Sequence, residues 1–190
     1  MSNGLVISAP QSGSGKTIIT LGILRALKNR GIPISSAKSG PDYIDPGFHT
    51  FSSGSECYNL DAWAMGEARL KNIVSRKDNL IIEGAMGLFD GAPPNAKGST
   101  AHLAKLLNFP IVLIIDSSRT GQSIAALAKG FLTYDKNLLI KGIILNNVGS
   151  ANHENKGVNV LFVDGSVSWM KVPEFEALMN EQGIADYLTK

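Results

Sequence analysis

The fold is decided by LVISAPQSGSGKT, residues 5–17. Its apolar first part, Leu5–Ala9, predicts a β-strand, and the segment Thr17–Asn29 has the spacing of a helix that ends before Gly31. A Gly/Ser-rich loop between a strand and a helix is typical of a phosphate-binding loop, because glycines let backbone N–H groups turn toward phosphate oxygens. The helix N-terminus adds partial positive charge at the same place.

The loop predicts a set of nucleotide contacts. In such loops the lysine reaches the β- and γ-phosphates and the threonine hydroxyl ligates Mg²⁺. The residues concerned are Ser12, Gly13, Ser14, Gly15, Lys16 and Thr17. The usual first glycine of the pattern is Pro10 here, so the alternative is a Gly/Ser-rich turn that ends in a surface lysine.

Outward from this loop, short apolar runs alternate with segments of helical spacing, as in βαβ units. The strands have few polar interruptions, which predicts a mostly parallel sheet covered by helices on both faces, a three-layer α/β fold. The predicted strands are Leu5–Ala9, Ile34–Lys38, Leu80–Glu83, Ile111–Asp116 and Gly142–Asn146, and the further helices are Asp61–Val74, Thr100–Leu107 and Gly121–Thr133.

The chain changes character near residue 150, where an excess of basic residues gives way to an excess of acidic ones. Val158–Val163 and Ser166–Met170 read as strands around the turn Asp164-Gly165, which predicts a β-hairpin, and Glu174–Gln182 reads as a short helix. We therefore predict two parts, residues 1–150 and a tail at 151–190.

Composition excludes several classes of protein. The 190 residues are 44% hydrophobic and 18% charged with a net charge of +2, which fits one globular chain. The apolar runs are too short for a membrane span, no basic patch suggests nucleic acid, and the single Cys57 excludes an internal disulfide. The N-terminus lacks a secretory pattern, so we expect a cytoplasmic protein that binds neither nucleic acid nor membrane.

The segment KSGPDYIDPGFH, residues 38–49, follows the second predicted strand. Loops at the carboxyl ends of parallel strands line the ligand crevice, so Lys38, Asp42 and Asp45 are expected beside the phosphate loop. A lysine and two carboxylates there suggest metal binding and charge neutralisation, and His49 could touch an anionic substrate. The alternative is a turn in which the aspartates only cap backbone amides.

Three later strands end in polar residues as well. Glu83, followed by glycines, is a candidate Mg²⁺ ligand. Asp116 fits a helix cap as well as a ligand. Asn146 could read a base edge or form a turn with Asn147.

Six motifs together resemble one family. They are APQSGSGKT, KSGPDYIDPGFH, NLDAW, EGAMGLFDG, GSTAHLAKLL and GIILNNVGS. In order and spacing, residues 4–150 resemble the N-terminal synthetase domain of the cobyrinic acid a,c-diamide synthases, and the APQSGSGKT form is similar to members that act on cobalt-free hydrogenobyrinic acid.

The resemblance implies a P-loop fold related to dethiobiotin synthetase. It also implies an ATP-dependent amide ligase of cobalamin biosynthesis that phosphorylates the a and c acetate carboxylates of a corrin ring before ammonia displaces the phosphate. The implied roles are catalytic for Lys16, Lys38 and Asp45, Mg²⁺ binding for Thr17, Asp42 and Glu83, substrate contact for Tyr43, Asp45 and His49, and adenine recognition for Asn146.

Other features depart from the family. We expect a truncated synthetase domain without the family's glutaminase domain, so that ammonia comes free or from a separate partner. The tail resembles a pseudopilin-like C-terminal segment and could have a separate origin. The alternatives are a dethiobiotin-synthetase-like ligase, a partitioning-type ATPase switch and an inactive nucleotide-binding fragment, and a homodimer is left open.

Overall fold

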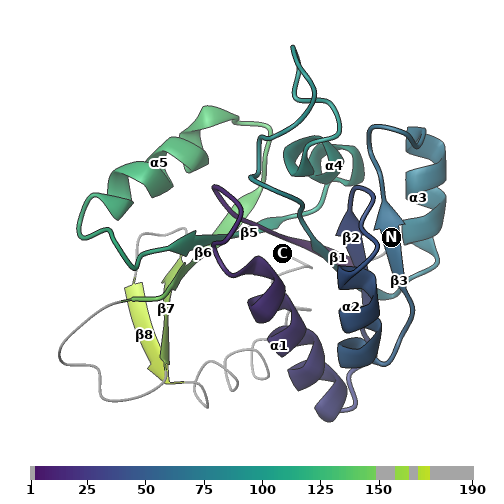
Figure 1. Ribbon diagram of the computed structural model, residues 1–190, viewed down its shortest axis with the longest axis horizontal. Coiled ribbons are helices and arrows are strands. Elements are labelled where there is room, and N and C mark those ends of the chain that lie inside the picture. The colour runs from purple at the N-terminus through teal and green to yellow at the C-terminus, as the bar shows by residue number, and fades with distance from the viewer. Residues whose placement is uncertain (1–2, 149–156, 163–166, 172–190) are drawn as a thin grey trace.

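A computed structural model describes residues 3–148, 157–162 and 167–171 of the chain, the last two ranges by their backbone alone. Its centre is one eight-stranded sheet in the order β3-β2-β4-β1-β5-β6-β7-β8 (Figure 1). The strands are β1 (Asn3–Ser8), β2 (Ser35–Ser39), β3 (Cys57–Leu60), β4 (Asn79–Glu83), β5 (Ile111–Asp116), β6 (Ile140–Asn146), β7 (Gly157–Phe162) and β8 (Val167–Lys171).

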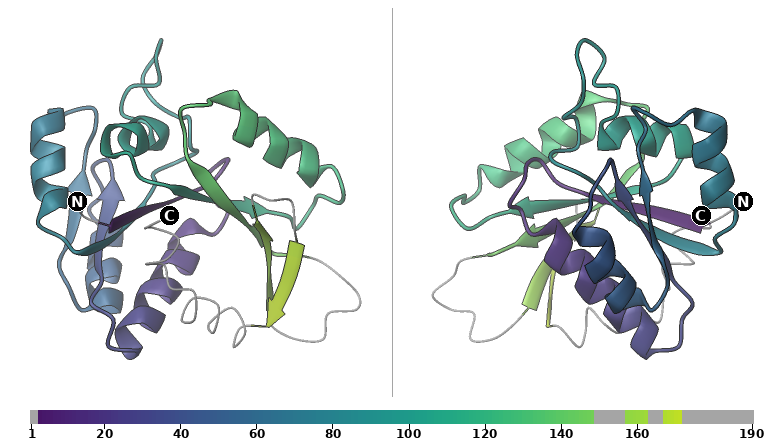
Figure 2. Two further views of the ribbon diagram at one scale, coloured as in Figure 1. Left: turned by 180° about the vertical axis from the view of Figure 1, so that it is seen from behind. Right: turned by 45° about the vertical axis from the view of Figure 1, so that its right-hand side comes forward.

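The strands from β3 to β6 pair in parallel, and helices connect them across both faces of the sheet. Figures 1 and 2 show α1 and α2 on one face and α3, α4 and α5 on the other. The helices are α1 (Lys16–Asn29), α2 (Asp45–Ser53), α3 (Glu67–Ser75), α4 (Thr100–Leu107) and α5 (Ile124–Tyr134). This is the predicted three-layer α/β architecture.

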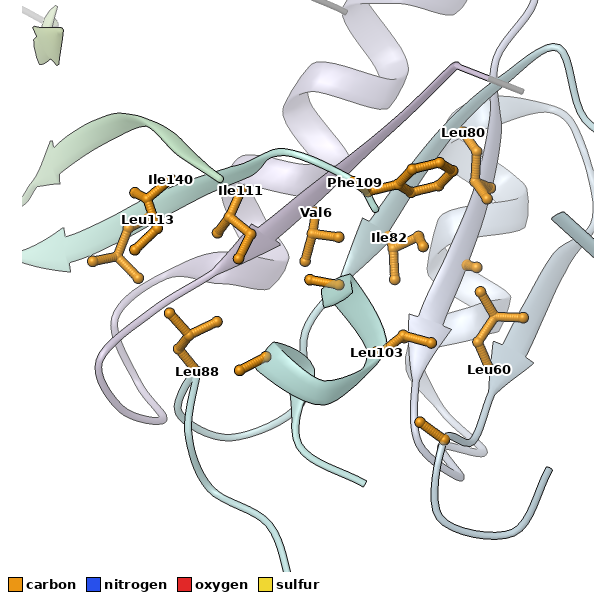
Figure 3. Packing of buried hydrophobic residues seen from close by; sticks show 14 of the residues in the cluster. Val6, Leu60, Leu80, Ile82, Leu88, Leu103, Phe109, Ile111, Leu113 and Ile140 are labelled. Carbon is orange, nitrogen blue, oxygen red and sulfur yellow. The ribbon is translucent and has the colours of Figure 1, made fainter. Parts of the chain in front are cut away.

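Each face of the sheet has its own hydrophobic core, because successive strand residues point to opposite sides. Val6 packs with α3, α4 and α5, whereas its neighbour Ile7 packs with α1. Figure 3 shows the first core, where Leu103 of α4 lies against the strand side chains of Val6 and Ile82. Burial on both faces explains why the strands are apolar without alternation.

All five strands predicted before residue 150 are present, within one or two residues at each end. The helix predicted at Asp61–Val74 begins later, at Glu67, because Asp61 caps a turn by accepting hydrogen bonds from the backbone of Trp63 and Ala64. The sequence did not predict α2 or β3. Residues 45–49, expected as part of a loop, instead begin a helix that runs to Ser53, with Pro46 in its first turn, where proline is favoured.

The predicted hairpin is confirmed for the described part of the tail. β7 pairs antiparallel with β6, and β8 pairs antiparallel with β7, so the hairpin extends the sheet beyond β6. The turn at Asp164-Gly165 and the helix predicted at Glu174–Gln182 lie outside the described residues. Within the ranges that are described, no helix is both long and apolar enough to cross a membrane.

Candidate functional site

The phosphate loop lies between β1 and α1, as predicted. Gly15 precedes the helix with φ of +96°, a left-handed conformation that glycine adopts without strain. The Ser14 hydroxyl donates to the carbonyl of Gln11 and closes the loop. Lys16 Nζ donates to the Met86 carbonyl at 2.6 Å and to the Gln11 carbonyl at 3.3 Å. The lysine therefore joins the phosphate loop to the segment that follows β4.

Glu83, at the end of β4, is the centre of the site and has no exposed surface. Its Oε1 accepts hydrogen bonds from the Thr17 hydroxyl at 2.6 Å and from Lys38 Nζ at 2.7 Å. Its Oε2 lies 2.7 Å from His49 Nε2. The carboxylate thus joins side chains from α1, β2 and α2.

The sheet register explains why these groups meet. Glu83 is the register partner of Ile7 on β1 and of Lys38 on β2, so the three residues lie side by side on one face. Ile7 packs into the core beneath α1, which identifies this as the face that α1 and α2 cover. A carboxylate and an ammonium group are therefore buried next to each other, where their attraction offsets part of the desolvation cost.

Lys38 is surrounded by carboxylates. Besides Glu83, its Nζ forms a hydrogen bond with Asp45 Oδ2 and lies 3.7 Å from Asp42 Oδ2. Asp42 Oδ1 accepts from the backbone N–H groups of Ile44 and Asp45, so this aspartate also caps the start of α2. Asp42 therefore caps backbone amides, as the alternative interpretation expected. Its other carboxylate oxygen, Oδ2, still faces Lys38.

His49 lies behind this cluster rather than at its surface. The side chain is completely buried, which is at odds with the expected contact to a substrate. Its ring reaches the sheet because α2 packs against α1 and over the ends of β2 and β3. Among the described residues, His49 Nδ1 has no hydrogen-bond partner.

These contacts set the charge states of the cluster. Burial alone would lower the pKa of His49, but Cys57 and Glu83 outweigh it and raise that pKa to about 9. Burial opposes the charged form of Glu83 too, yet hydrogen bonds from His49, Lys38 and Thr17 hold its pKa below the usual value. Burial alone would lower the pKa of Lys38, but its interactions with Asp45 and Glu83 raise that pKa. All three groups are charged at neutral pH.

Burial lowers the pKa of Lys16 more than the charges of Glu83 and Asp90 raise it. An anion beside this lysine would therefore compensate a charge that the protein has partly desolvated. The phosphate loop accordingly has the electrostatics of an anion site.

The oxygen atoms around Thr17 are suitable ligands for Mg²⁺. Its hydroxyl and Glu83 Oε1 are adjacent hard oxygen atoms at the start of α1. Mg²⁺ at nucleotide sites takes one or two protein oxygens and completes its shell with phosphate and water. Among the residues that the structure describes, no group of three or more His, Cys, Asp or Glu side chains could hold a metal alone. The arrangement therefore suits a cation that arrives with a nucleotide.

Asn146 contacts the phosphate loop directly. Its side-chain N–H donates to the Ser14 carbonyl at 3.0 Å, and its own carbonyl accepts from the backbone and hydroxyl of Ser117. A Cβ on Gly15 would lie 2.2 Å from the Asn146 amide nitrogen, so the glycine allows this approach. Asp116 Oδ1 accepts from the Ser118 backbone within a turn, and the next helix, α5, begins only at Ile124, so Asp116 does not act as its cap.

The structure brings most predicted site residues to one end of the sheet. Ser12 and Gly13 are exposed on the loop, and Tyr43 is 95% exposed just before α2. Met86 was missed, because its carbonyl acts here rather than its side chain. Its φ of +50° is unusual for a residue other than glycine, and no sequence pattern signals that conformation.

A parallel sheet with this loop, a buried carboxylate at the neighbouring strand end and a helix directly after the loop defines a P-loop nucleotide-binding domain. Residues 5–179 match the model of the CobQ/CobB/MinD/ParA nucleotide binding domain, and the chain belongs to that family.

Curated relatives share almost half of their matched residues with this chain. The hydrogenobyrinate a,c-diamide synthase of Brucella anthropi is 46% identical over 187 residues, which are 96% of this chain and 41% of that protein. The enzyme of the same name from Mesorhizobium japonicum is 50% identical over 155 residues, 78% of this chain and 35% of that protein. The chain therefore spans about two fifths of the length of these relatives.

Solved structures share the fold at low sequence identity. The signal recognition particle receptor FtsY of Elizabethkingia anophelis has a TM-score of 0.53 at 15% identity, covering 75% of this chain and 49% of that one. Chloroplast FtsY of Physcomitrella patens has a TM-score of 0.51 at 14% identity, covering 95% and 66%. The likeness confirms the P-loop architecture.

Proposed function

We propose that this chain is an ATP-dependent synthetase domain that activates the a and c acetate carboxylates of hydrogenobyrinic or cobyrinic acid for amidation. The observation that carries the proposal is the continuous set of contacts from Thr17 through Glu83 and Lys38 to Asp45. These contacts run from the phosphate loop to the exposed segment around Tyr43. Its relatives' names supply the substrate class.

The chemistry has two steps. A carboxylate is a poor acyl donor, so its oxygen first attacks the γ-phosphorus of ATP, and the bond to the ADP oxygen breaks. Ammonia then attacks the acyl carbon, phosphate leaves, and loss of a proton yields the amide. Catalysis of the first step depends on positioning and on charge compensation at the transferred phosphoryl group.

Each site residue has a role in this proposal. Lys16 compensates charge on the β- and γ-phosphates, and Lys38 does so at the transferred group. Asp45 orients Lys38 on the substrate side, and Tyr43 is available to contact the substrate. Mg²⁺, when bound, offsets phosphate charge, with Thr17 and Glu83 as its ligands.

Further residues contribute to nucleotide and metal binding in this proposal. Asp42 is an additional ligand candidate through its second oxygen. Asn146 reads the adenine in this proposal, and it could do so only after giving up or sharing its bond to Ser14. Ser12 and Gly13, both exposed, offer backbone N–H groups to the phosphates.

The second step of the proposed reaction needs a source of ammonia. The only cysteine in the sequence is Cys57, which lies in β3 inside the nucleotide-binding sheet. We propose that ammonia comes from solution or from a glutaminase partner, and that the protein works in the cytoplasm as a monomer or homodimer.

A mass-spectrometric amidation assay tests the proposal. The chain is incubated with hydrogenobyrinic or cobyrinic acid, Mg-ATP and ammonium, in parallel with Lys16→Ala and with Lys71→Ala, a half-exposed lysine on α3. Mono- and diamide products from the unaltered chain and Lys71→Ala, but not from Lys16→Ala, are expected. Mg-dependent ATP binding without amide would refute the synthetase assignment and favour a nucleotide switch or an inactive fragment. Amidation of neither corrinoid but ligation of a diaminocarboxylic acid with bicarbonate would favour the dethiobiotin-synthetase-like alternative.

Asp45→Asn separates nucleotide binding from chemistry. The asparagine keeps the size of the side chain but removes the negative charge beside Lys38. We expect ATP affinity within a few-fold of the unaltered chain and a large loss of amidation. An equal loss of both would argue against a distinct substrate-side role for Asp45.

A further inference from the structure

His49 makes a contact that neither nucleotide binding nor substrate contact explains. It lies on α2 with no exposed surface, and its Nε2 is 2.7 Å from Oε2 of an equally buried Glu83. The backbone carbonyl of His49 accepts from the Ser53 hydroxyl, which adds a second local restraint in the same helix. A buried polar side chain of this kind is held by a specific partner.

The donors around Glu83 are divided between its two oxygens. Thr17 and Lys38 both donate to Oε1, whereas His49 is the described side chain that bonds Oε2. The terminal torsion of a glutamate is broad, so bonds at one oxygen alone leave the carboxylate plane poorly defined. A donor at Oε2 fixes that plane and directs Oε1 toward the Thr17 hydroxyl.

We infer that His49 is a positioning residue that orients the Glu83 carboxylate for a divalent cation bound with the nucleotide at Thr17. The inference rests on the proposed function only in requiring a nucleotide and a divalent cation, not in requiring a corrinoid substrate. Partners behind a metal ligand of this kind typically change metal affinity by about 10- to 100-fold when they are removed.

The position of His49 on α2 also links Glu83, a proposed Mg²⁺ ligand, to Asp45, which is proposed to act near the substrate. Asp45 begins the same helix, one turn before His49, and it bonds the same Lys38 that bonds Glu83. Loss of the His49 bond therefore removes one of the two side-chain links between α2 and this cluster. The link through Asp45 and Lys38 remains.

Two substitutions distinguish a hydrogen bond from mere packing. His49→Met keeps a long, helix-compatible side chain but removes the donor, whereas His49→Gln keeps an N–H donor of similar reach. His102→Met is the matched control, because His102 lies on α4, on the opposite face of the sheet, where its Nδ1 accepts from the Gly98 backbone.

The assay measures Mn²⁺ affinity by electron paramagnetic resonance, with ADP present, and ADP affinity without metal. We expect His49→Met to weaken Mn²⁺ binding about 10-fold or more, His49→Gln to stay within a few-fold, and His102→Met to have no effect. Metal-free ADP affinity should be unchanged in all three variants. Unaltered Mn²⁺ affinity in a folded His49→Met, or equal losses in Met and Gln, would overturn the positioning role.

A spectroscopic measurement keeps the inference testable if His49→Met does not fold. In the unaltered chain labelled with ¹⁵N-histidine, the Nε2–H proton of His49 should be protected from solvent exchange and should shift when diamagnetic Mg²⁺ is added to the ADP complex. A rapidly exchanging proton would refute the buried bond. Because neither readout involves amide formation, failure of the amidation assay leaves this test unaffected.

Discussion

Buried His49, with Cys57 and Glu83 as its neighbours, makes the stability of this protein depend on pH in a specific window. The pKa of His49 is about 9 in the folded chain, against 6.5 for the ordinary side chain that the unfolded state approximates. A raised pKa in the folded state means that folding favours the protonated imidazole. The stabilisation is therefore complete below pH 6.5 and is lost as the pH rises through 9.

The size of the effect follows from the difference between those two values. Each pKa unit corresponds to about 1.4 kcal/mol, so the protonated ring contributes at most about 3.5 kcal/mol to the free energy of unfolding. Because stabilities of single domains are about 5–15 kcal/mol, this is a measurable share. The decline should be steepest between pH 6.5 and 9, where the unfolded ring has released its proton and the folded ring has not.

Urea denaturation followed by circular dichroism, at pH 6, 7, 8 and 9 without metal or nucleotide, measures this contribution. The difference in unfolding free energy between the unaltered chain and His49→Gln should shrink by about 2–3 kcal/mol over that range, since glutamine does not titrate. His102→Gln provides the reference for a histidine whose pKa is lowered, chiefly by burial. A difference that stays constant with pH would refute the protonated, buried imidazole, and one that grows with pH would reverse the sign of the argument.

Three further predictions concern the loop, its contacts and the core. Gly87→Ala should lower both the melting temperature and ATP affinity, measured by calorimetry, because its Cβ would lie 2.4 Å from the Pro10 carbonyl oxygen. Asn146→Ala removes the bond to the phosphate loop and should cost about 1 kcal/mol of stability by urea denaturation, with no change if the amide is freely solvated. Leu113→Ala, at a fully buried strand position, should cost roughly 2–5 kcal/mol, whereas Leu127→Ala, 42% exposed on α5, should cost below about 1 kcal/mol.

The strands and the phosphate loop could be predicted because their signals are local. The apolar run at Leu5–Ala9, the glycines after it and the lysine that opens the helix are contiguous, and each favours the same structure. The hairpin of β7 and β8 is predictable for a similar reason, since a two-residue Asp-Gly turn separates two strand-like runs. No long-range contact is needed to recognise either feature.

The helix α2 could not be predicted in this way. Its sequence begins Asp45-Pro46-Gly47, and proline with glycine reads as a turn when the surrounding contacts are unknown. Proline is nevertheless well tolerated in the first helical turn, and Asp42 supplies acceptors for the free backbone N–H groups there. The buried contact of His49 with Glu83 then anchors the helix, and that contact spans 34 residues of sequence.

The cluster around Glu83 depends on the strand order, which explains why local patterns identified its members but not their roles. β4 lies between β2 and β1 although it follows them in sequence, so Lys38 and Ile7 flank Glu83 on one face of the sheet. Had β4 been at an edge, the glutamate would have had one neighbouring strand and open access to water, and a histidine from α2 could have remained exposed. The central position instead buries the carboxylate and makes each of its donors necessary. His49, which the sequence suggests as a substrate contact, is therefore buried behind Glu83 instead, and we propose that it orients this carboxylate.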